Sequence, residues 1–219
     1  MTPTFLSLLA DDDRDALLAI GGQRRFPTGQ RLMHQGEPGD RVMVIIDGHV
    51  KTSFVDADGR EVVLSFLGPG DVLGELSFTH VEPRSASVTA LNPVVASALT
   101  ATDFRGFLER RPAAAIVLID VISRRFRDAN RKRVQSAGQD TMGRLATRLV
   151  ELSERYGEPG EDGVAIGLPI TQADLCGWIA SSRAGVAAAL RTMRELGWIR
   201  TERRRMIVLD VEAITQRAG

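Results

Sequence analysis

The sequence predicts an α+β protein with a β-rich first half, a long helix in the middle and a helical last third that includes a hairpin. Short apolar runs separated by glycine turns continue to about residue 99, and a helical spacing of apolar residues takes over near residue 111. The length of 219 residues allows one large domain or two small ones. We expect three segments, at residues 1–112, 113–139 and 140–219.

The first segment predicts a sandwich or barrel of short strands. Gly, Pro and Asp recur between runs rich in apolar and β-branched residues, as at residues 36–40 and 68–71. Closely spaced strands with glycine turns are typical of these two folds. The expected strands are residues 41–46, 49–55, 61–66, 85–90 and 94–98. Neither the GxGxxG nor the Walker motif of nucleotide-using enzymes is present.

The middle segment predicts a helix that begins near Pro112 and carries a narrow apolar stripe. The stripe repeats at spacings of four and three residues, and basic residues cover most of the remaining surface. Its members are Ala115, Ile119, Ile122, Phe126 and Ala129. Such a seam favours pairing with the same helix of a second copy. The alternative is that the stripe packs only on the chain's own β domain.

A hinge is expected where Gly138 interrupts this helix. Asp140 is a candidate N-cap for a second helix, which runs to about Tyr156 and ends at Gly157.

The last segment predicts two short helices joined by a tight turn, followed by a basic hairpin. A polar loop at residues 157–163 and a strand-like stretch at 164–166 precede the first helix, at 171–179. The second helix is alanine-rich and covers about residues 183–196. This order of elements is typical of a winged helix-turn-helix, a DNA-binding motif.

The charge is distributed unevenly, although it sums to zero. A net charge of 28 − 28 = 0 taken alone argues against a nucleic-acid binder. By segment, residues 1–112 hold 11 basic and 15 acidic residues, 113–139 hold 6 and 2, and 140–219 hold 11 and 11. Within the last segment, residues 171–205 carry seven arginines against three acidic residues. Positive charge is therefore concentrated in the helix-turn-helix segment.

Several classes of protein are excluded or disfavoured by composition. Cys176 is the only cysteine, which excludes an intramolecular disulfide and a cysteine-held iron–sulfur cluster, and we expect it to be buried in the first short helix. The three histidines show no paired spacing on one strand, so we expect no metal. No apolar run reaches about 18 residues and no export signal precedes the first segment. We therefore expect a cytoplasmic protein that has no membrane partner.

Seven motifs, matched in order and spacing along nearly the whole chain, resemble the CRP/FNR family of bacterial transcription regulators. They are residues 36–40, 45–51, 68–71, 74–77, 83–86, 143–146 and 170–186. The resemblance implies a double-stranded β-roll that senses an effector, a long dimerisation helix and a winged helix-turn-helix that binds double-stranded DNA. It also implies a homodimer, RNA polymerase as a partner, and neither catalytic activity nor a covalent cofactor.

A cyclic nucleotide is the effector that the sensor motifs suit. An arginine fork with backbone N–H groups at a helix start suits its phosphate, and a carboxylate suits the ribose hydroxyl. The resemblance assigns these roles to Arg84 and Glu75. On the dimer helix, Ala129 offers no hydrogen bond while Asn130 can reach a base edge, so the choice between cyclic AMP and cyclic GMP stays open. The expected ligand-binding residues are Gly74, Glu75, Leu76, Arg84, Ser85, Asn130 and Ser65.

Base and phosphate contacts to DNA are assigned by the same resemblance. Arg183, at the start of the second short helix, is expected to bind guanine. The other expected DNA-binding residues are Thr171, Ser182, Arg191, Arg203, Arg204 and Arg205. Ala184 and Ala188 stand where the cyclic-AMP receptor has further base-reading residues, which predicts a different operator or weaker discrimination.

Three alternatives remain at this point. In one, the pocket is vestigial, Glu75 and Arg84 pair with each other, and the protein binds DNA without a cyclic nucleotide. A cupin-type enzyme shares the β-roll but needs a histidine cluster for metal. A regulatory subunit of an enzyme shares the sensor but has no use for Arg183 and the arginine hairpin.

Overall fold

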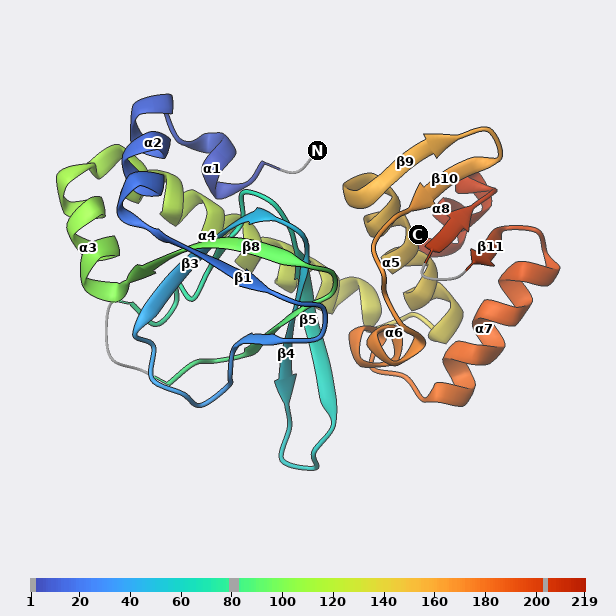
Figure 1. The fold of residues 1–219 in the computed structure, drawn as a ribbon. Coiled ribbons are helices and arrows are strands. Elements are labelled where there is room, and N and C mark those ends of the chain that lie inside the picture. Colours follow the sequence, from blue (N-terminus) through green and yellow to red (C-terminus); the bar gives the residue numbers. More distant parts are fainter. Residues whose placement is uncertain (1–2, 79–82, 203–204) are drawn as a thin grey trace. The chain divides into compact units, whose positions relative to one another are not determined.

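The computed structural model describes residues 3–78, 83–202 and 205–219, which form two compact units. The first unit contains residues up to Ala129, and the second begins at Asn130. The division falls within helix α4 (Pro112–Ser136), which contributes residues to both units (Figure 1).

Two four-stranded antiparallel sheets form the framework of the first unit (Figure 1). One has the strand order β1-β8-β3-β6 and the other β2-β7-β4-β5. The strands are β1 (Gly22–Phe26), β2 (Arg31–Met33), β3 (Arg41–Asp47), β4 (Val50–Val55), β5 (Glu61–Leu67), β6 (Val72–Leu73), β7 (Ser87–Ala90) and β8 (Val94–Thr100). This arrangement confirms the β-roll.

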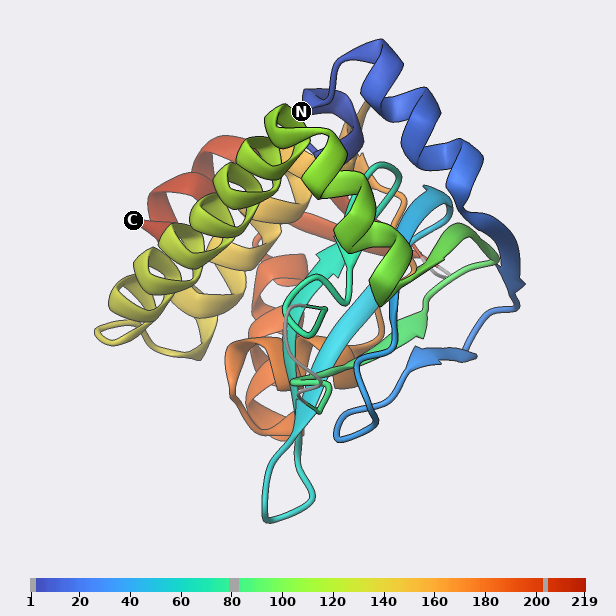
Figure 2. The same cartoon turned by 90° about the vertical axis from the view of Figure 1, so that its left-hand side faces the viewer.

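Both faces of β3 are buried, which explains its unbroken apolar run. Met43 and Ile45 face the second sheet and pack with residues of both sheets, whereas Val42 and Val44 face the opposite side. Four helices cover that opposite side (Figure 2). They are α1 (Phe5–Leu8), α2 (Asp11–Ile20), α3 (Ala101–Arg110) and α4.

The face of α4 that packs on the β-roll is not the predicted stripe. Ala114, Leu118 and Val121 are buried against the roll. Of the stripe, Ile122 packs partly there, whereas Ile119 and Phe126 are 59% and 67% exposed. The alternative that the whole stripe packs on the chain's own β domain is therefore wrong.

The second unit combines three helices and a small sheet with the helix that follows the hinge. Its elements are α5 (Thr141–Tyr156), β9 (Gly157–Gly160), β10 (Gly163–Ile166), α6 (Gln172–Ile179), α7 (Arg183–Glu195), β11 (Ile199–Glu202), β12 (Arg205–Val208) and α8 (Val211–Ala218). The strand order is β11-β12-β10-β9. Leu149, Leu190 and Ile214 are buried where α5 packs against α7 and α8. The predicted winged helix-turn-helix is confirmed.

Several elements of the structure were not predicted. The predicted polar loop at residues 157–163 is wrong, because β9 and β10 pair there as a hairpin. Strand β1 was missed because its residues Gln23, Arg24 and Arg25 are polar and exposed, as an edge strand allows. Helix α8 was also missed. Asp210 is the N-cap of this helix, and its side chain accepts the N–H of Ala213. Because aspartate is a preferred N-cap residue, it could have indicated the helix from the sequence.

Asp140 caps α5 as predicted. Its Oδ1 accepts a hydrogen bond from the N–H of Gly143 at 2.8 Å, and it forms an ion pair with Arg217 of α8. The Gly143 N–H, with a smaller contribution from Arg217, lowers the pKa of Asp140 from its ordinary value of 3.8. The stabilisation is therefore present above about pH 4 and is lost as the pH falls through the lowered value.

We expect Asp140→Ala to lower the free energy of unfolding by about 1 kcal/mol at neutral pH, because the helix loses its cap. Urea unfolding at pH 7 and pH 3 measures the effect, which should shrink at the lower pH. Asp140→Asn is the matched control, since it keeps a capping oxygen without the charge. An equal loss for Asp140→Ala at both pH values would contradict the expectation.

Candidate functional site

The candidate effector pocket lies where the turn after β6 meets the segment before β7. Residues 74–78 form turns, so the helix start expected to supply N–H groups is wrong for these residues. Gly74 has a φ of +78°, and a Cβ there would lie 2.3 Å from Nη1 of Arg84 and 2.8 Å from the carbonyl of Arg41. Glycine is needed both for the turn and for the space that Arg84 occupies.

Arg84 is buried and held mainly by neutral oxygens. Its side chain is 6% exposed, Nη2 donates to the carbonyl of Arg41 at 2.6 Å, and Nη1 donates to the carbonyl of Gly74 at 3.4 Å. The nearest described carboxylate oxygen is that of Asp40, at 3.7 Å. Burial lowers the pKa of the Arg84 guanidinium, and Asp40 is the strongest opposing influence. A buried cation with so little compensation suits an anionic ligand.

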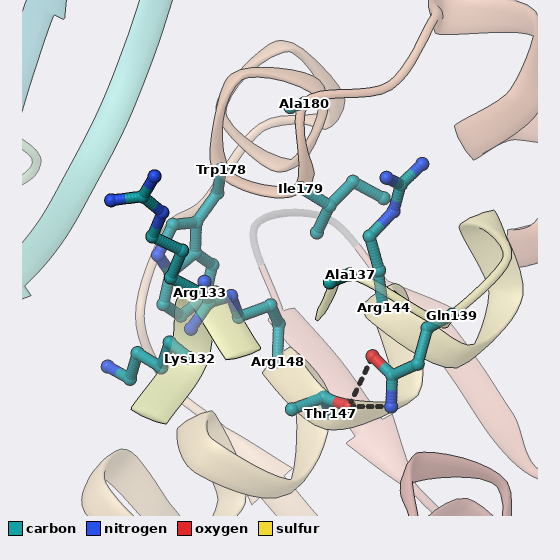
Figure 3. A pocket seen from close by; sticks show the side chains of 10 residues that line it. All are labelled: Lys132, Arg133, Ala137, Gln139, Arg144, Thr147, Arg148, Trp178, Ile179 and Ala180. Atoms are coloured by element: carbon teal, nitrogen blue, oxygen red, sulfur yellow. Dashed lines mark hydrogen bonds between the residues drawn. The ribbon is translucent and has the colours of Figure 1, made fainter. Parts of the chain in front are cut away.

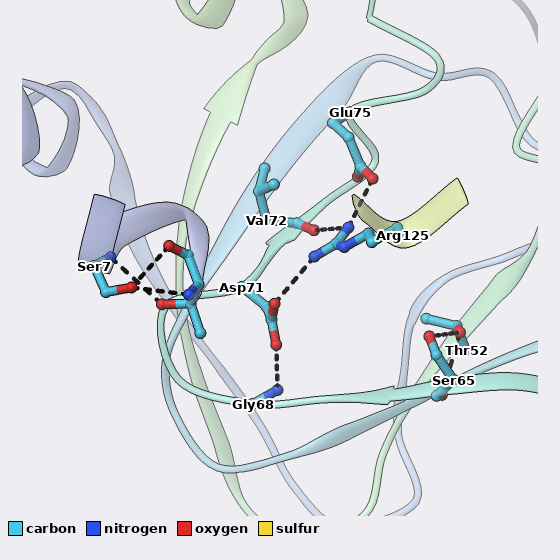
Figure 4. Close-up of polar contacts among 9 residues, drawn as sticks. Ser7, Thr52, Ser65, Gly68, Asp71, Val72, Glu75 and Arg125 are labelled. Atoms are coloured by element: carbon cyan, nitrogen blue, oxygen red, sulfur yellow. Dashed lines mark hydrogen bonds and ion pairs between the residues drawn. The ribbon is translucent and has the colours of Figure 1, made fainter. Parts of the chain in front are cut away.

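Glu75 is bound by an arginine of helix α4 (Figure 4). Nη1 of Arg125 donates to Glu75 at 2.8 Å and to the carbonyl of Val72 at 3.0 Å, and Nη2 donates to Asp71 at 3.1 Å. Both carboxylates are buried, and Asp71 also accepts the N–H of Gly68. Among the described residues Glu75 and Arg84 form no ion pair, so the pairing assumed for a vestigial pocket is not formed.

Arg125 and Asp71 were not predicted to be site residues. Arg125 was grouped with the basic residues that cover the surface of the helix outside the apolar stripe. A signal was available, because Arg125 follows Leu118 and Val121 at spacings of seven and four, which places it on the buried face of α4. Nothing local to Asp71 marks it as its partner, since the two are 54 residues apart.

The other predicted pocket residues lie in less enclosed positions. Ser85 is exposed, and Leu76 is 59% exposed. Ser65 on β5 faces Thr52 on β4, with 2.8 Å between their hydroxyl oxygens (Figure 4). Asn130 is exposed on the part of α4 that belongs to the second unit, so its contact with a ligand stays a prediction.

Two of the predicted DNA-binding residues, Thr171 and Ser182, are the N-cap residues of α6 and α7. Thr171 donates its hydroxyl proton to Asp174 at 2.7 Å and accepts the Asp174 N–H at 3.1 Å, which forms a capping box. This hydroxyl cannot donate to a phosphate at the same time. Ser182 caps α7 by accepting the N–H of Gly185 at 3.1 Å. Both residues are exposed.

Helix α7 has one buried apolar face and one face that is exposed to solvent. Its buried residues are Val186, Ala189, Leu190 and Met193. Arg183 and Arg191 are exposed, and neither forms an ion pair with any residue that the structure describes. Arg205 is exposed on β12, whereas Arg203 and Arg204 lie outside the described residues. The open face therefore combines free cations with the small side chains of Ala184 and Ala188.

Comparison with known proteins identifies both parts of the chain. Residues 23–111 match the cyclic nucleotide-binding domain family, and residues 143–217 match the Crp-like helix-turn-helix domain family. The CRP-like cAMP-activated global transcriptional regulator of Mycobacterium tuberculosis H37Rv is 34% identical over 193 residues, which cover 88% of this chain and 86% of that protein. The chain belongs to the CRP/FNR family of transcription regulators.

One further relative and two solved structures are also similar to this chain. The cAMP-activated global transcriptional regulator CRP of Salmonella typhimurium is 27% identical, covering 84% of this chain and 88% of that one. Among solved structures, the c-di-GMP-responsive global regulator CLP of Xanthomonas campestris superimposes with a TM-score of 0.81 at 19% identity, covering 91% of this chain and 99% of that one. FixK2 of Bradyrhizobium japonicum gives 0.79 at 17%, with coverages of 91% and 98%. These two structures support the fold.

Membership of the CRP/FNR family confirms that the chain is a DNA-binding regulator and not an enzyme. Cys176 is half-buried on α6, so the expectation that it is buried is only partly met. Among the described residues, no cluster of His, Cys, Asp and Glu side chains could hold a metal, and no helix is long and apolar enough to cross a membrane.

Proposed function

We propose that this regulator is a homodimer whose binding to DNA is modulated by a cyclic nucleotide in the β-roll. The observation that carries the proposal is the buried guanidinium of Arg84, held by the carbonyls of Gly74 and Arg41, with the carboxylate of Glu75 in the adjoining turn. This pair offers a cation for a phosphate and an acceptor for a ribose hydroxyl.

Arg125 provides a physical route from the ligand to helix α4. A ribose hydroxyl that donates to Glu75 competes with Arg125 for the same carboxylate, which Arg125 now contacts at 2.8 Å. A ligand shifts an equilibrium only through contacts that differ between states. Redistribution of Arg125 between Glu75 and Asp71 supplies such a difference at the helix proposed to pair two copies.

The exposed apolar residues of α4 support the dimer. Ile116, Ile119 and Phe126 are 67%, 59% and 67% exposed, although each is large enough to stabilise a helix pair. Pairing would place two copies of α7 in successive major grooves, about 34 Å apart. RNA polymerase as a partner of the DNA-bound dimer stays a prediction.

Calorimetric titration of the full-length protein with cyclic AMP, cyclic GMP and linear 5′-AMP tests the sensor. We expect saturable binding of at least one cyclic nucleotide and much weaker binding of the linear control. The reason is that Arg84 offers one buried guanidinium to the single charge of a cyclic phosphate, whereas a linear monophosphate carries nearly two charges at pH 7. No heat with either cyclic nucleotide, together with retained binding to DNA, would favour the alternative. In that alternative the pocket is vestigial and DNA is bound without a nucleotide.

Arg183→Ala is expected to weaken binding to a selected DNA site by about 1–3 kcal/mol and to relax the preference at one base pair. Arg191→Ala should weaken binding to all sequences alike and reduce the slope of log K against log salt by about one. Selection of sites from random DNA and titrations at several salt concentrations measure both effects. Arg194→Ala on the same helix is the control, since Arg194 bonds Thr201. Unchanged site preference in Arg183→Ala would contradict the assignment.

A further inference from the structure

The main chain of Arg84 is held by a short antiparallel pairing with the loop between β2 and β3. The N–H of Arg84 donates to the carbonyl of Glu37 at 2.8 Å, and the N–H of Gly36 donates to the carbonyl of Arg84 at 2.9 Å. We call residues 35–37 the pairing segment. Because it bonds both the N–H and the carbonyl of Arg84, its position determines where the Arg84 side chain begins.

Gln35 attaches the pairing segment to strand β4 through its side-chain amide. Nε2 of Gln35 donates to the carbonyl of Val55 at 3.3 Å, and Oε1 accepts the N–H of Val55 at 2.8 Å. The main-chain N–H of Gln35 also donates to Oγ of Ser87 at 3.0 Å. Gln35 is half-buried and Ser87 is buried. One residue therefore fixes the pairing segment through its side chain and its main chain.

The amide of Gln35 takes the place of a neighbouring strand. Strand β7 pairs with β4 only as far as Ser53 and Ser87, and Val55 lies two residues beyond that pair. A primary amide offers an acceptor and a donor side by side, as the edge of a strand does. It satisfies the edge of β4 where β7 is no longer present, so the chain before Ser87 can leave the sheet. Arg84 belongs to this chain and bonds the pairing segment instead of β4.

We propose that Gln35 is a positioning residue for the anion site of the β-roll. By tying the pairing segment to β4, Gln35 keeps the main chain of Arg84 where its guanidinium reaches the carbonyls of Gly74 and Arg41. Gln35 acts through Arg84 and does not itself contact the ligand. Its effect on affinity rests on the proposed binding of a cyclic nucleotide, whereas its effect on the main chain of Arg84 does not.

Amide hydrogen exchange of the full-length protein without ligand, followed by NMR at single residues, tests the positioning role. Gln35→Met keeps the length of the side chain and removes both bonds to Val55. We expect the N–H of Arg84 to exchange about tenfold faster in this variant, because its acceptor on Glu37 is no longer held in place. If only the N–H of Val55 exchanges faster, Gln35 stabilises the end of β4 alone and the proposal is wrong.

Gln35→Glu is the conservative variant. It keeps an oxygen that can accept the N–H of Val55 but loses the donor to the Val55 carbonyl. We expect it to restore part of the protection of the Arg84 N–H that Gln35→Met removes. Exchange of Arg84 as fast in Gln35→Glu as in Gln35→Met would contradict a role for the bond to Val55.

Gln139 supplies a matched control in the second unit. Its Nε2 donates to Oγ1 of Thr147 at 3.1 Å (Figure 3) and to the carbonyl of Ala218 at 2.6 Å. Gln139→Met therefore also removes a glutamine amide that makes two hydrogen bonds, but it should leave the exchange of Arg84 unchanged. The proposal is wrong if Gln139→Met accelerates that exchange as much as Gln35→Met does.

Calorimetric titration with cyclic AMP and cyclic GMP tests the consequence for the ligand. Gln35→Met should bind the nucleotide about three- to tenfold more weakly than the wild type, which corresponds to the net effect of one or two hydrogen bonds. Unchanged affinity despite faster exchange of Arg84 would overturn the role in binding. If the wild type binds neither nucleotide, the proposed function fails, and the exchange of Arg84 still decides whether Gln35 positions it.

Discussion

Replacement of Arg125 by alanine is expected to lower the free energy of unfolding of the first unit by about 3 kcal/mol. The substitution leaves Glu75 and Asp71 buried at 8% and 6% side-chain exposure without the cation that both contact. Removal of one partner from a buried ion pair is costly because the remaining charge loses its counter-charge while it stays out of water. In a protein of this length, the loss corresponds to a fall in Tm on the order of 10 °C.

Arg124→Ala is the matched control for this measurement. Arg124 is the adjacent residue on the same helix, and its ion pair with Asp120 is 47% and 39% exposed. Exposed pairs contribute about 0–1 kcal/mol, so the control should melt within a few degrees of the wild type. Differential scanning calorimetry of both variants without ligand gives the comparison. If Arg125→Ala melts with Arg124→Ala, Arg125 is not a structural partner of the two carboxylates.

Replacement of Arg84 by alanine is expected to cause the second large effect, a loss of affinity for the cyclic nucleotide. Truncation of one partner of a buried, hydrogen-bonded charge pair costs about 2–5 kcal/mol, which is a loss of affinity of roughly 30-fold to several thousandfold. The pocket supports this magnitude, since Arg84 is the only described guanidinium held by the carbonyls of Gly74 and Arg41. The measurement is the calorimetric titration with cyclic AMP and cyclic GMP.

Arg41→Ala separates the role of Arg84 from a general loss of positive charge. The side chain of Arg41 is 51% exposed and pairs with Asp40, while its carbonyl, which holds Arg84, remains in the variant. Arg84→Lys keeps the charge but not the planar fork, and we expect it to restore only part of the affinity. Equal heats for wild type and Arg84→Ala would refute a phosphate site at Arg84.

Most of the fold could be predicted because its signals are local. The glycine turns around β3–β5, Asp140 before α5 and the break at Ala180 are each set by a few neighbouring residues. Elements without such signals were missed, and so was α8, although its N-cap Asp210 is a local signal. Strand β1 has a polar sequence, and only its pairing with β8, some 70 residues later, makes it a strand.

Some residues of the candidate sites could likewise be predicted from local motifs, whereas other features of the sites depend on the three-dimensional structure. Motif spacing was enough to predict that Arg84 and Glu75 bind the ligand and that Arg183 binds DNA. It could not reveal that Thr171 already donates its proton to Asp174, because a hydroxyl's partner depends on the local geometry of the helix start.

The sequence by itself determined the family, the order of the β-roll, long helix and winged helix-turn-helix, and a concentration of positive charge hidden by a net charge of zero. These follow from residue types, spacing and near neighbours. Only the tertiary structure decided which charges meet. Arg125 contacts carboxylates that lie 50 and 54 residues earlier in the chain. The spacing from Leu118 and Val121 indicates that Arg125 lies on the buried face of α4. Which carboxylates it meets there depends on how distant segments pack, and no local pattern encodes that choice.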